Sequence, residues 1–484
     1  MTATTPFKFR RIARVTIELT TPLHLGNGLP GEVTDAGVAT DANGLPAVPG
    51  SSLAGSLRSA LRERSGAQAA ADIFGDSLSD KEANRARKES GLPSRSSRIS
   101  VSWACIHDAD DRPVEGIATE ADEVLLAARE PTLRDHVRID SRGAAEERGK
   151  FDELAVHAGH RFTFEMELVA TADDPDDEES WNALLGILCS GDLRIGGKSR
   201  RGFGAFKPVR IAQAVFDLSD PEGFTAYRDH PVSLTASADG LSERELDPAS
   251  SSAPFATLRL KPRGLWMFGG GADVAENTRG VDLAPVRDTR IVWTEDKAEV
   301  IADVVYLPGS SVKGALSHRI AYHYNRIAGI FAKTDEHPDG VEDPSLASGP
   351  ENNPAVKLLF GYVKTKEEKG LRGRVLIDDV YLSPEVPDLR VPHVKIDGFT
   401  GGAFPGALFD ERPLLGLPPE IPAMEISVRL LETEAILKEA EGPRALEALK
   451  AALEDLSTGD LPLGGGVNRG LGAMDGEIKF SEAA

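Results

Sequence analysis

The sequence contains an internal repeat, and a repeat limits the possible folds of a chain more than any other feature. Pro49-Gly50-Ser51-Ser52-Leu53 recurs 259 residues later as Pro308-Gly309-Ser310-Ser311-Val312. Four further blocks recur in the same order at offsets between 257 and 268 residues. A single short match arises by chance, whereas five collinear matches indicate a duplicated domain with loop insertions. We therefore expect two domains of the same fold.

The repeat also sets the domain boundaries. We expect a first domain at residues 1–212, a linker at 213–254 that is rich in Asp, Ser, Pro and Ala, and a second domain at 255–484. An insertion at about residues 330–354 interrupts the second copy and has no counterpart in the first. The blocks that fix this alignment are His136 to Asp140 with His393 to Asp397, Phe151 to Glu153 with Phe409 to Glu411, Gly191 to Leu193 with Gly459 to Leu461, and Gly202 to Gly204 with Gly470 to Gly472.

The order of expected elements is the same in each half. Residues 10–19 alternate between apolar and polar side chains, which predicts a strand, and a helix is predicted to follow with Ser51 and Ser52 as its caps. Residues 162–168 and their counterparts 424–431 alternate again, before a second helix, a glycine loop and a final strand. This is the order of a ferredoxin-like βαββαβ domain. The predicted fold class is therefore α+β, with two tandem domains of this type.

Composition excludes several classes of protein. The 484 residues carry 77 acidic and 55 basic side chains, and this net charge of −22 argues against a protein that coats nucleic acid non-specifically. A local basic groove is still compatible with that total. No apolar run reaches the roughly 18 residues of a membrane span, and Met1 to Arg14 lacks the apolar stretch of a signal peptide. Cys105 and Cys189 have no metal-site spacing, so we expect a cytoplasmic protein.

The Pro-Gly-Ser-Ser motif has two interpretations. In the first, Pro and Gly make a turn and Ser caps a helix. In the second, hydroxyl groups and backbone N–H groups at the start of the helix hold a phosphate. The duplication, together with Lys313 shortly after the second copy, favours a phosphate site built from Ser51, Ser52, Ser310 and Ser311.

Each half closes with a glycine-rich loop, residues 196–204 and 464–472. Neither loop has Walker A spacing, and neither follows a strand and opens a helix as a dinucleotide-binding loop does. Such a loop is either a turn that needs positive φ or a place where the backbone comes close to a polyanion. Six basic residues and no acid between residues 194 and 210 favour the polyanion in the first loop. The candidate contacts are Gly196, Gly197, Lys198, Arg200 and Arg201, and then Gly465, Gly466, Asn468 and Arg469.

Paired carboxylates form a third repeated pattern. Asp35 and Asp41 lie six residues apart before the first Pro-Gly-Ser-Ser motif, and Asp282 and Asp288 lie six apart before the second. Loop aspartates are mostly solvated or close Asx-turns, but such a residue can also help to bind a metal ion or to position a 2′-hydroxyl for attack on phosphate. The histidines that stand out, each interpreted first as a structural group of a strand, are His24, His136 and His393.

These residues resemble the RAMP superfamily, the repeat-associated backbone proteins of type III CRISPR–Cas effector complexes. In the first half the resemblance rests on Leu23 to Gly28, Asp35, and Leu45 to Gly55. Both glycine loops are similar to the closing loop of that family. In the second half the matching blocks are Phe268 to Gly271, Asp282 to Asp288, Leu307 to Gly314, Phe360-Gly361, His393 to Asp397 and Gly406 to Asp410.

The resemblance implies a fold and a set of partners. Each domain is expected to be a ferredoxin-like fold of the RNA-recognition type with inserted thumb-like loops. Two such domains in one chain are similar to the tandem backbone subunit of a type III-D complex, which implies guide crRNA, target RNA and other type III CRISPR effector subunits as partners. The residues expected to contact RNA are Ser51, Ser52, Arg58, His136, Ser310, Ser311, Lys313, His393 and the loop residues named above.

The resemblance also implies a reaction. In the members that cut RNA, an Asp before the Pro-Gly-Ser-Ser helix supports metal-dependent cleavage by attack of the 2′-hydroxyl, and the ion is expected to be divalent, such as Mg²⁺. By position that catalytic and metal-binding residue is Asp35 in the first half and Asp282 in the second. The sequence departs from the pattern at Ala54, where Lys is usual, and no Pro lies beside Asp35. Asp282 therefore matches the pattern more closely.

Three functions remain open from the sequence. The first is a backbone subunit that binds guide crRNA and acts as a metal-dependent RNA endonuclease on the paired target. The second is a scaffold that makes the same phosphate contacts without chemistry. The third is a nuclease that processes guide precursors without metal, with His or Lys as acid and base. We favour them in this order.

Overall fold

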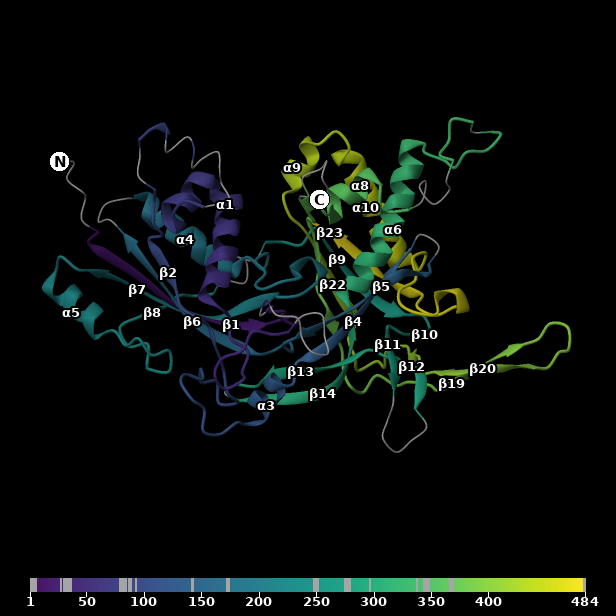
Figure 1. The fold of residues 1–484 in the computed structure, drawn as a ribbon, viewed down its shortest axis with the longest axis horizontal. Helices are drawn as coiled ribbons and strands as arrows, with labels where there is room; N and C mark the ends of the chain where they lie inside the picture. Colours follow the sequence, from purple (N-terminus) through teal and green to yellow (C-terminus); the bar gives the residue numbers. More distant parts are fainter. Residues whose placement is uncertain are drawn as a thin grey trace.

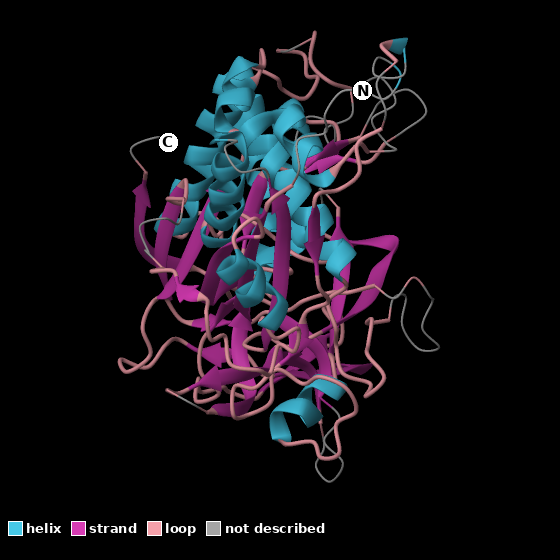
Figure 2. Cartoon of the chain, turned by 90° about the vertical axis from the view of Figure 1, so that its left-hand side faces the viewer, coloured by secondary structure: helices cyan, strands magenta, loops and turns pink. Residues whose placement is uncertain are grey.

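The computed structural model describes residues 7–26, 28, 37–77, 85, 89–91, 94–140, 143–170, 175–246, 252–273, 280–295, 297–336, 338–342, 349–364 and 370–481. Figure 1 shows two halves side by side, each with helices above a sheet. In the view of Figure 2 the long helices gather on one side of the molecule and most strands lie below them. The expected catalytic residue Asp35 lies outside the described residues.

The first half is built on an antiparallel sheet in which the strands lie in the order β2-β6-β1-β7-β8, with β3 paired to β6. Residues 12–19 of the central strand are all buried, because helices cover one face of the sheet and a returning segment covers the other. The elements are β1 (Phe9–Leu19), α1 (Gly50–Phe74), β2 (Ile99–Val101), β3 (Cys105–Ile106), α3 (Glu123–Arg129), β6 (Arg161–Ala170), α4 (Pro175–Cys189), η1 (Ser199–Arg201), β7 (Phe206–Asp217), α5 (Pro221–Asp229) and β8 (Ser242–Glu243).

The second half repeats this arrangement. Its main sheet has the order β17-β22-β9-β23, which matches β2-β6-β1-β7, and α6 packs with α10 above it. Each half has its own apolar core, so the α+β class and the duplication are confirmed. The elements are β9 (Ala256–Pro262), α6 (Gly309–Ala328), α8 (Pro354–Phe360), β17 (Val375–Ile377), β22 (Met424–Leu430), α9 (Thr433–Lys438), α10 (Gly442–Thr458), η3 (Val467–Arg469) and β23 (Met474–Phe480).

Smaller strands of the second half extend from this sheet. They form the sheet β11-β12-β20-β19, the sheet β13-β14-β18 and two short pairs. The strands are β10 (Leu265–Trp266), β11 (Gly269–Asp273), β12 (Val281–Pro285), β13 (Arg287–Trp293), β14 (Ala298–Leu307), β15 (Gly361–Tyr362), β16 (Leu371–Arg372), β18 (Val380–Tyr381), β19 (Val391–Ile396), β20 (Ala403–Glu411) and β21 (Leu414–Leu415). The pair β13–β14 reaches back to the first half, where the Trp293 ring nitrogen donates to the Gly159 carbonyl at 2.7 Å.

Each half also carries a long hairpin at the same place in the repeat. In the first half it consists of β4 (Thr132–Ile139) and β5 (Ala145–Ala155), and in the second half of β19 and β20. Figure 1 shows β4–β5 lying beside α6 of the second half, whereas β19–β20 projects from the molecule. Equivalent hairpins therefore have different surroundings.

Two sequence expectations about this fold need correction. Ser51 and Ser52 do not cap the first helix, because α1 already begins at Gly50 after Pro49 and its cap makes no side-chain hydrogen bond. The helix starts there because Gly50 lies against the end of β2: a Cβ atom at this position would be 2.1 Å from the Val101 carbonyl oxygen. The serines therefore lie in the first turn of the helix.

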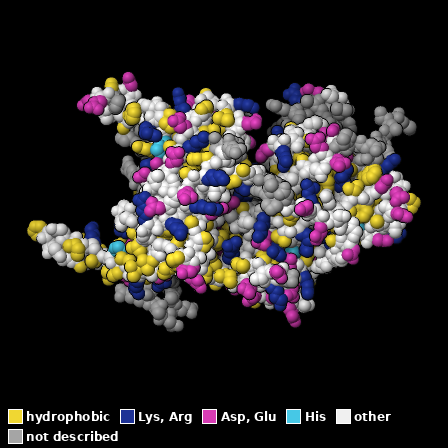
Figure 3. Space-filling model, turned by 180° about the vertical axis from the view of Figure 1, so that it is seen from behind, with side chains coloured by type: hydrophobic (Ala, Val, Ile, Leu, Met, Phe, Trp, Pro, Cys, Tyr) yellow, Lys and Arg dark blue, Asp and Glu magenta, His cyan; other side chains and the backbone are white. Residues whose placement is uncertain are grey.

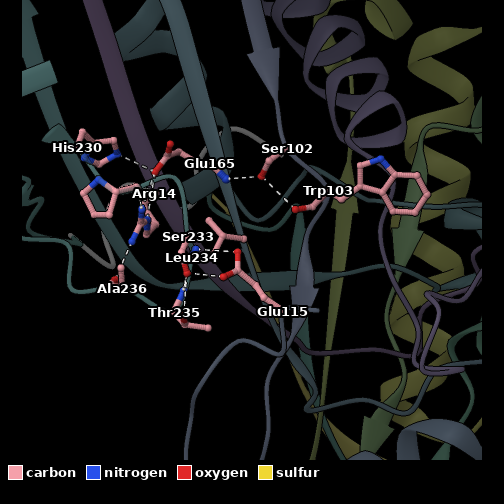
Figure 4. A network of polar contacts seen from close by, with 11 residues as sticks. Arg14, Ser102, Trp103, Glu115, Glu165, His230, Ser233, Leu234, Thr235 and Ala236 are labelled. Carbon is pink, nitrogen blue, oxygen red and sulfur yellow. Dashed lines mark hydrogen bonds and ion pairs between the residues drawn. The ribbon is translucent and has the colours of Figure 1, made fainter. Parts of the chain in front are cut away.

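The second correction concerns the segment 213–254, which we interpreted as a linker. Its first residues continue β7, and Asp220 caps α5 by accepting from the Gly223 N–H at 2.9 Å. The chain then crosses the open face of the first sheet, where the Arg14 guanidinium on β1 donates to the Pro231 and Ala236 carbonyls (Figure 4). A composition typical of loops predicted none of these contacts. Much of the segment is therefore part of the first half.

Among the described residues, no helix is both long enough and apolar enough to cross a membrane. The expected insertion at residues 330–354 follows α6 and is described only in part; its described residues include a bridge between Ala332 and Val341.

Candidate nucleic-acid interface

The two halves meet along a set of polar contacts that we name the polar seam. Its residues are Arg134, Arg194, Ser199 and Arg200 of the first half and Lys313, Arg372, Asp378 and Asp379 of the second. Arg134 on β4 pairs with Asp379 at 3.1 Å, and Arg194 pairs with Asp378 at 2.9 Å. The Lys313 ammonium donates to the Arg200 carbonyl at 2.6 Å, and Arg372 donates to the Ser199 hydroxyl at 3.3 Å. The glycine loop of the first half is thus held by the second half.

A cavity of about 890 Å³ opens beside this seam. The sequence predicted five of its residues as RNA contacts, and they come from the start of α1 and from the first glycine loop: Ser51, Ser52, Gly196, Gly197 and Arg200. Three more arginines line it, namely Arg64, Arg194 and Arg372, together with the acids Glu63, Asp192 and Glu432. The fold therefore brings the two predicted phosphate-binding motifs of the first half into one place.

Arg200 lies in this cavity near Arg194 and Arg372, and also near the carboxylates of Glu63 and Glu432. Its Nε atom is buried and has no hydrogen-bond partner among the described residues. Burial, and next the nearby charge of Arg372, lower the pKa of Arg200 to about 10. An arginine beside other arginines in a partly closed space favours the binding of an anion, because an anion supplies the missing acceptor and offsets the repulsion between the arginines.

The glycines of the two loops are needed for backbone geometry. Gly196 and Gly464 have φ values of 75° and 93°, and a Cβ atom on them would lie 2.5 Å from the His24 carbonyl oxygen and 2.2 Å from the Met267 carbonyl oxygen. Gly465 donates its N–H to the same Met267 carbonyl at 2.7 Å. These glycines let each loop lie directly on the strand end of its own half, which is the turn interpretation of the motif.

A charged contact then joins each glycine loop to the hairpin of its own half. Arg201 and Lys198 donate to the buried carboxylate of Glu153 on β5, at 2.5 and 2.8 Å. In the second half Arg469 donates to the buried Glu411 on β20 at 2.5 Å. We predicted these three basic residues as RNA contacts, and the structure shows each of them already bound to a glutamate. The repeat contained the two glutamates, but nothing in the sequence linked them to the loops.

Two of the three histidines that the sequence singled out, His136 and His393, lie on these hairpins. His136 stacks on Phe151 with ring centroids 5.1 Å apart, and His393 stacks on Phe409 at 4.7 Å. The His393 ring is also hydrogen-bonded to Glu411 at 2.7 Å. The buried Nε2 atom of His136 has no partner among the described residues, and burial lowers the pKa of this histidine. All four rings are half-buried, and the two pairs differ in that His393 has a carboxylate partner whereas Nε2 of His136 has no partner among the described residues.

Other predicted contacts have local roles. The Arg58 guanidinium donates to the Gly75 carbonyl at 2.8 Å, which ties α1 to the loop that follows it. Burial, then the charges of Arg200 and Arg201, lower the pKa of Lys313 to about 7, so this lysine is enclosed at the seam. Ser310 and Ser311 lie in the first turn of α6, and Gly466 and Asn468 lie at η3 on the outer side of the second half. Nδ1 of His24 donates to the Leu154 carbonyl at 2.8 Å, so this histidine has a structural role.

The carboxylates of the second half separate into two environments. Asp282 on β12 is exposed, and one of its oxygens accepts from the Asp410 backbone N–H at 2.8 Å. Asp288 is buried, where Arg134, His157 and the Tyr381 hydroxyl all contact it. Burial alone would raise the pKa of Asp288, but the His157 hydrogen bond and the Arg134 charge hold it below its usual value. Asp282 is therefore accessible to a substrate, and Asp288 is a structural group.

In the first half Asp41 closes an Asx-turn by accepting from the Asn43 and Leu45 N–H groups at 2.8 and 2.9 Å. For a metal ion the described part of the chain offers no group of three or more His, Cys, Asp or Glu side chains that could hold it. The neighbour of Asp282, the Asp410 carboxylate, is paired with Arg390 at 2.5 Å. The described residues thus do not form a metal site by themselves, and no metal-dependent step follows from their geometry.

Comparison with known proteins gives one match that covers most of the chain. No curated protein matches the chain. A sequence model described as the RAMP superfamily matches two regions, residues 16–207 and residues 266–475. These regions coincide with the two halves seen in the structure, and each contains the helix start, the hairpin and the glycine loop described above. The chain therefore belongs to the RAMP superfamily, with one family domain in each half.

Proposed function

We propose that the chain is an RNA-binding subunit of a CRISPR ribonucleoprotein effector and that it binds guide crRNA at the polar seam. Membership of the RAMP superfamily supports the class of complex. The strand order β2-β6-β1-β7 and its repeat support a ferredoxin-like topology for each domain, as in proteins of the RNA-recognition type. Two such domains in one chain support a tandem backbone subunit of a type III-D-like complex, with other effector subunits as partners.

The observation that carries this proposal is the arginine cluster in the seam cavity. Arg194, Arg200 and Arg372 come from both halves and line the same space as the first turn of α1. The backbone N–H groups of such a turn favour an anion, and the unpartnered Nε atom of Arg200 provides a donor. A phosphate of an RNA strand would supply an acceptor for this Nε atom and negative charge beside the arginines, in a cavity that is also lined by Glu63, Asp192 and Glu432. Binding through phosphates is independent of base sequence, as a guide-binding subunit requires.

The test compares wild-type protein with Arg200→Ala and Arg372→Ala in binding to single-stranded RNA. Each change removes one phosphate contact, so the affinity falls. The plot of log K against log salt concentration also becomes shallower, its slope decreasing in magnitude by about 0.7. Arg259→Ala is the matched control, because this side chain is 66% exposed and paired with Glu425 on another surface. Anisotropy titrations at several salt concentrations give both quantities. Equal affinities and slopes for the three variants would contradict the site.

We further propose that the assembled complex cleaves target RNA paired to the guide, by attack of a 2′-hydroxyl, with a divalent ion such as Mg²⁺ as cofactor. The exposed carboxylate of Asp282 supports a catalytic role in the second half, and Asp35 is its counterpart by sequence. Asp282→Asn and Asp35→Asn are each expected to remove one cleavage product and to leave guide binding unchanged. The exposed Asp239 gives the control Asp239→Asn. Product ends are mapped with and without a chelator, and unchanged cleavage by the double variant would refute the assignment.

A scaffold without catalytic activity is the second candidate. It is favoured by the ion pair between Arg390 and Asp410, because Asp410 is the carboxylate neighbour of Asp282 and already has a cationic partner. It predicts guide binding with the same dependence on Arg200 and Arg372 and no product that disappears when the chelator is added. The cleavage map therefore separates the two candidates.

A further inference from the structure

The face of the first sheet that lies away from α1 carries a row of polar side chains. Thr163 on β6, Thr16 on β1 and Arg210 on β7 are direct register partners across these three strands, so their side chains share one face of the sheet. The two threonines are each 2% exposed, and their hydroxyl oxygens lie 2.7 Å apart. Figure 3 shows acidic and basic side chains interspersed over one outer face of the molecule, whereas the threonine pair is buried in its interior.

His107 joins this row to a carboxylate. Its side chain is fully buried, its Nε2 atom lies 2.7 Å from the Thr163 hydroxyl oxygen, and its Nδ1 atom lies 2.7 Å from a carboxylate oxygen of Asp111. The His107 backbone N–H donates to the Arg161 carbonyl at 3.0 Å and so ties this residue to the start of β6. A hydroxyl, an imidazole and a carboxylate are therefore hydrogen-bonded in that order, as in an activated nucleophile with its base. We name Thr163, His107 and Asp111 the threonine triad.

The direction of the hydrogen bonds in the threonine triad follows from Asp111. Burial alone would raise the pKa of this carboxyl group, but the hydrogen bond from His107 and the charge of Arg161 hold that pKa below its usual value. The ionised carboxylate can only accept, so in the neutral imidazole Nδ1 carries the proton and Nε2 is an acceptor. The Thr163 hydroxyl therefore donates to Nε2, and that nitrogen is placed to take the proton from the hydroxyl.

The turn that carries Asp111 has an uncommon backbone conformation. Asp111 has a φ of 59°, in the left-handed region that residues with a Cβ atom seldom adopt. The Asp108 carboxylate holds the turn by accepting from the Asp110 and Arg112 N–H groups at 3.0 and 2.9 Å. Arg161 pairs with Asp111 at 3.1 Å. Such conformations persist only where the surrounding contacts fix them, and they are frequent at functional sites. The contacts of this turn keep the Asp111 carboxylate on His107.

A cavity of about 1040 Å³ opens onto the threonine triad at Thr163 and Asp111. Its floor is the sheet, and its walls are the loop 108–122 and residues 234–243 of the segment that crosses the sheet. Figure 4 shows one end of this cavity, where Glu115 of the loop accepts from the crossing segment. The seam cavity is lined by α1 and lies on the other face of the sheet, so the two cavities are separate.

The lining of this cavity indicates what it can hold. Polar side chains predominate in its walls, among them Thr119, Glu120, Thr235 and Ser237. Such walls suit a small polar molecule better than a hydrocarbon chain. Arg210 is the register partner of Thr16 in the polar row and also lines the cavity. A guanidinium group in this place stabilises an atom on which negative charge develops beside Thr163.

We propose that the threonine triad is an esterase site for small polar carboxylic esters, with Thr163 as the nucleophile and His107 as the general base. The Thr163 oxygen attacks the carbonyl carbon of the ester while His107 Nε2 takes the hydroxyl proton, and Arg210 offsets the negative charge on the carbonyl oxygen. The bond from the carbon to the leaving alcohol then breaks, the alcohol takes the proton from Nε2, and the acyl group stays on Thr163. Water attacks this acyl group and gives its proton to the same nitrogen, which releases the acid and restores the hydroxyl. Asp111 is a positioning residue, because it keeps the other imidazole proton on Nδ1.

Reaction of the purified RNA-free protein with p-nitrophenyl acetate tests the proposal. We expect a burst of p-nitrophenolate that is stoichiometric with the protein, followed by slower turnover, and peptide mapping should place the acetyl group on Thr163. Thr163→Ser keeps the hydroxyl and should keep the burst, whereas Thr163→Val should abolish it. Thr257→Val is the matched control, because Thr257 lies on β9 in the second main sheet and is half-buried. The control should react like the wild type, and p-nitrophenyl decanoate should give no burst with any of these proteins.

Two further variants separate catalysis from folding. His107→Gln should slow acylation by about 10²- to 10⁴-fold. Asp111→Asn lets Nε2 carry the proton, so it should lower the limiting rate of acylation and leave unchanged the ester concentration that gives half of this rate, a pattern that loss of a purely structural contact does not produce. Thr163→Val should bind RNA like the wild type, because the seam cavity lies on the other face of the sheet. A wild-type protein without a burst, acetyl groups found only on lysines, or a Thr163→Val variant that is acylated like the Thr257→Val control would overturn the proposal.

Discussion

The two glycine loops have the same internal construction and different surroundings. In each loop an arginine reaches back to a buried glutamate of the hairpin, Arg201 to Glu153 and Arg469 to Glu411. The first loop is enclosed by the second half and lies in a charged seam, whereas the second is exposed. The construction of a loop is thus encoded within one half, and its burial and charge are set by whatever docks on it.

The largest effect is expected when an ion pair of the polar seam, which encloses the first glycine loop, is removed. Arg134→Ala removes the shared partner of Asp288 and Asp379, whose side chains are 1% and 8% exposed, and should lower the free energy of unfolding by about 3 to 5 kcal/mol. Arg138→Ala on the same strand is the control, since its side chain is 69% exposed and its loss should cost about 0 to 1 kcal/mol. Urea unfolding measures both, and similar losses would show that the seam adds no stability.

A pH experiment sharpens the same comparison. Gly50 packs on Val101 as Gly309 packs on Ile377, so the first half has Trp103 in place of the carboxylate of Asp379. Burial raises the pKa of Asp379 from its usual 3.8 to about 6. Between these pH values the folded chain keeps a proton that the unfolded chain has lost, so the free energy of unfolding falls as pH rises, by about 3 kcal/mol at most. Asp379→Asn should lack this fall. Parallel stability curves for wild type and variant from pH 4 to pH 6 would contradict the assignment.

A pair of equivalent glycines tests whether the surroundings of the loops differ as described. Gly202 and Gly470 have φ values of 95° and 89°, so alanine is strained at both, by about 1 to 2 kcal/mol. A Cβ atom on Gly202 would also lie 3.0 Å from the Ile377 carbonyl oxygen across the seam, whereas none of the described atoms lies within 4 Å of one on Gly470. Gly202→Ala should therefore destabilise by about 1 kcal/mol more than Gly470→Ala in thermal unfolding. Equal losses of stability would mean that the two halves can move apart at this point at little energetic cost.

The smallest effect is expected in the exposed second glycine loop. Val467→Ser gives the second loop the residue that the first has at Ser199, and because Val467 is 39% exposed the free energy of unfolding should change by no more than about 0.5 kcal/mol. Calorimetry measures this change in dilute protein. A loss of stability above about 1 kcal/mol would indicate that Val467 stabilises the second loop, as the contacts of the seam stabilise the first.

The elements that repeat were the most predictable part of the fold. The strand at residues 10–19, the strands at 162–168 and 424–431, and the glycine loops all appear where periodicity and duplication placed them. Prediction failed at the start of α1, where close packing of Gly50 on Val101 rather than a serine side chain sets the first residue. It failed again at 213–254, because a loop-like composition carries no sign that a segment will lie across a sheet.

The candidate site was predictable in its local parts and not in its assembly. Ser51, Gly196 and Arg200 were found because each belongs to a motif with its own pattern. Arg372 was not found, since it lies in a two-residue strand of the second half. It lines the cavity only because the two halves pack together. Residue patterns report neighbours along one element, and they do not report which charges of two domains will face each other.

The polar seam also affects how the chain is made. Synthesis begins at the N-terminus, so the whole first half leaves the ribosome before Asp288, Asp378 and Asp379 exist. During that time Arg134 and Arg194, both buried in the finished protein, have water in place of their carboxylate partners. The ion pairs of the seam can therefore form only after residue 379 has been translated, although the first half has an apolar core of its own.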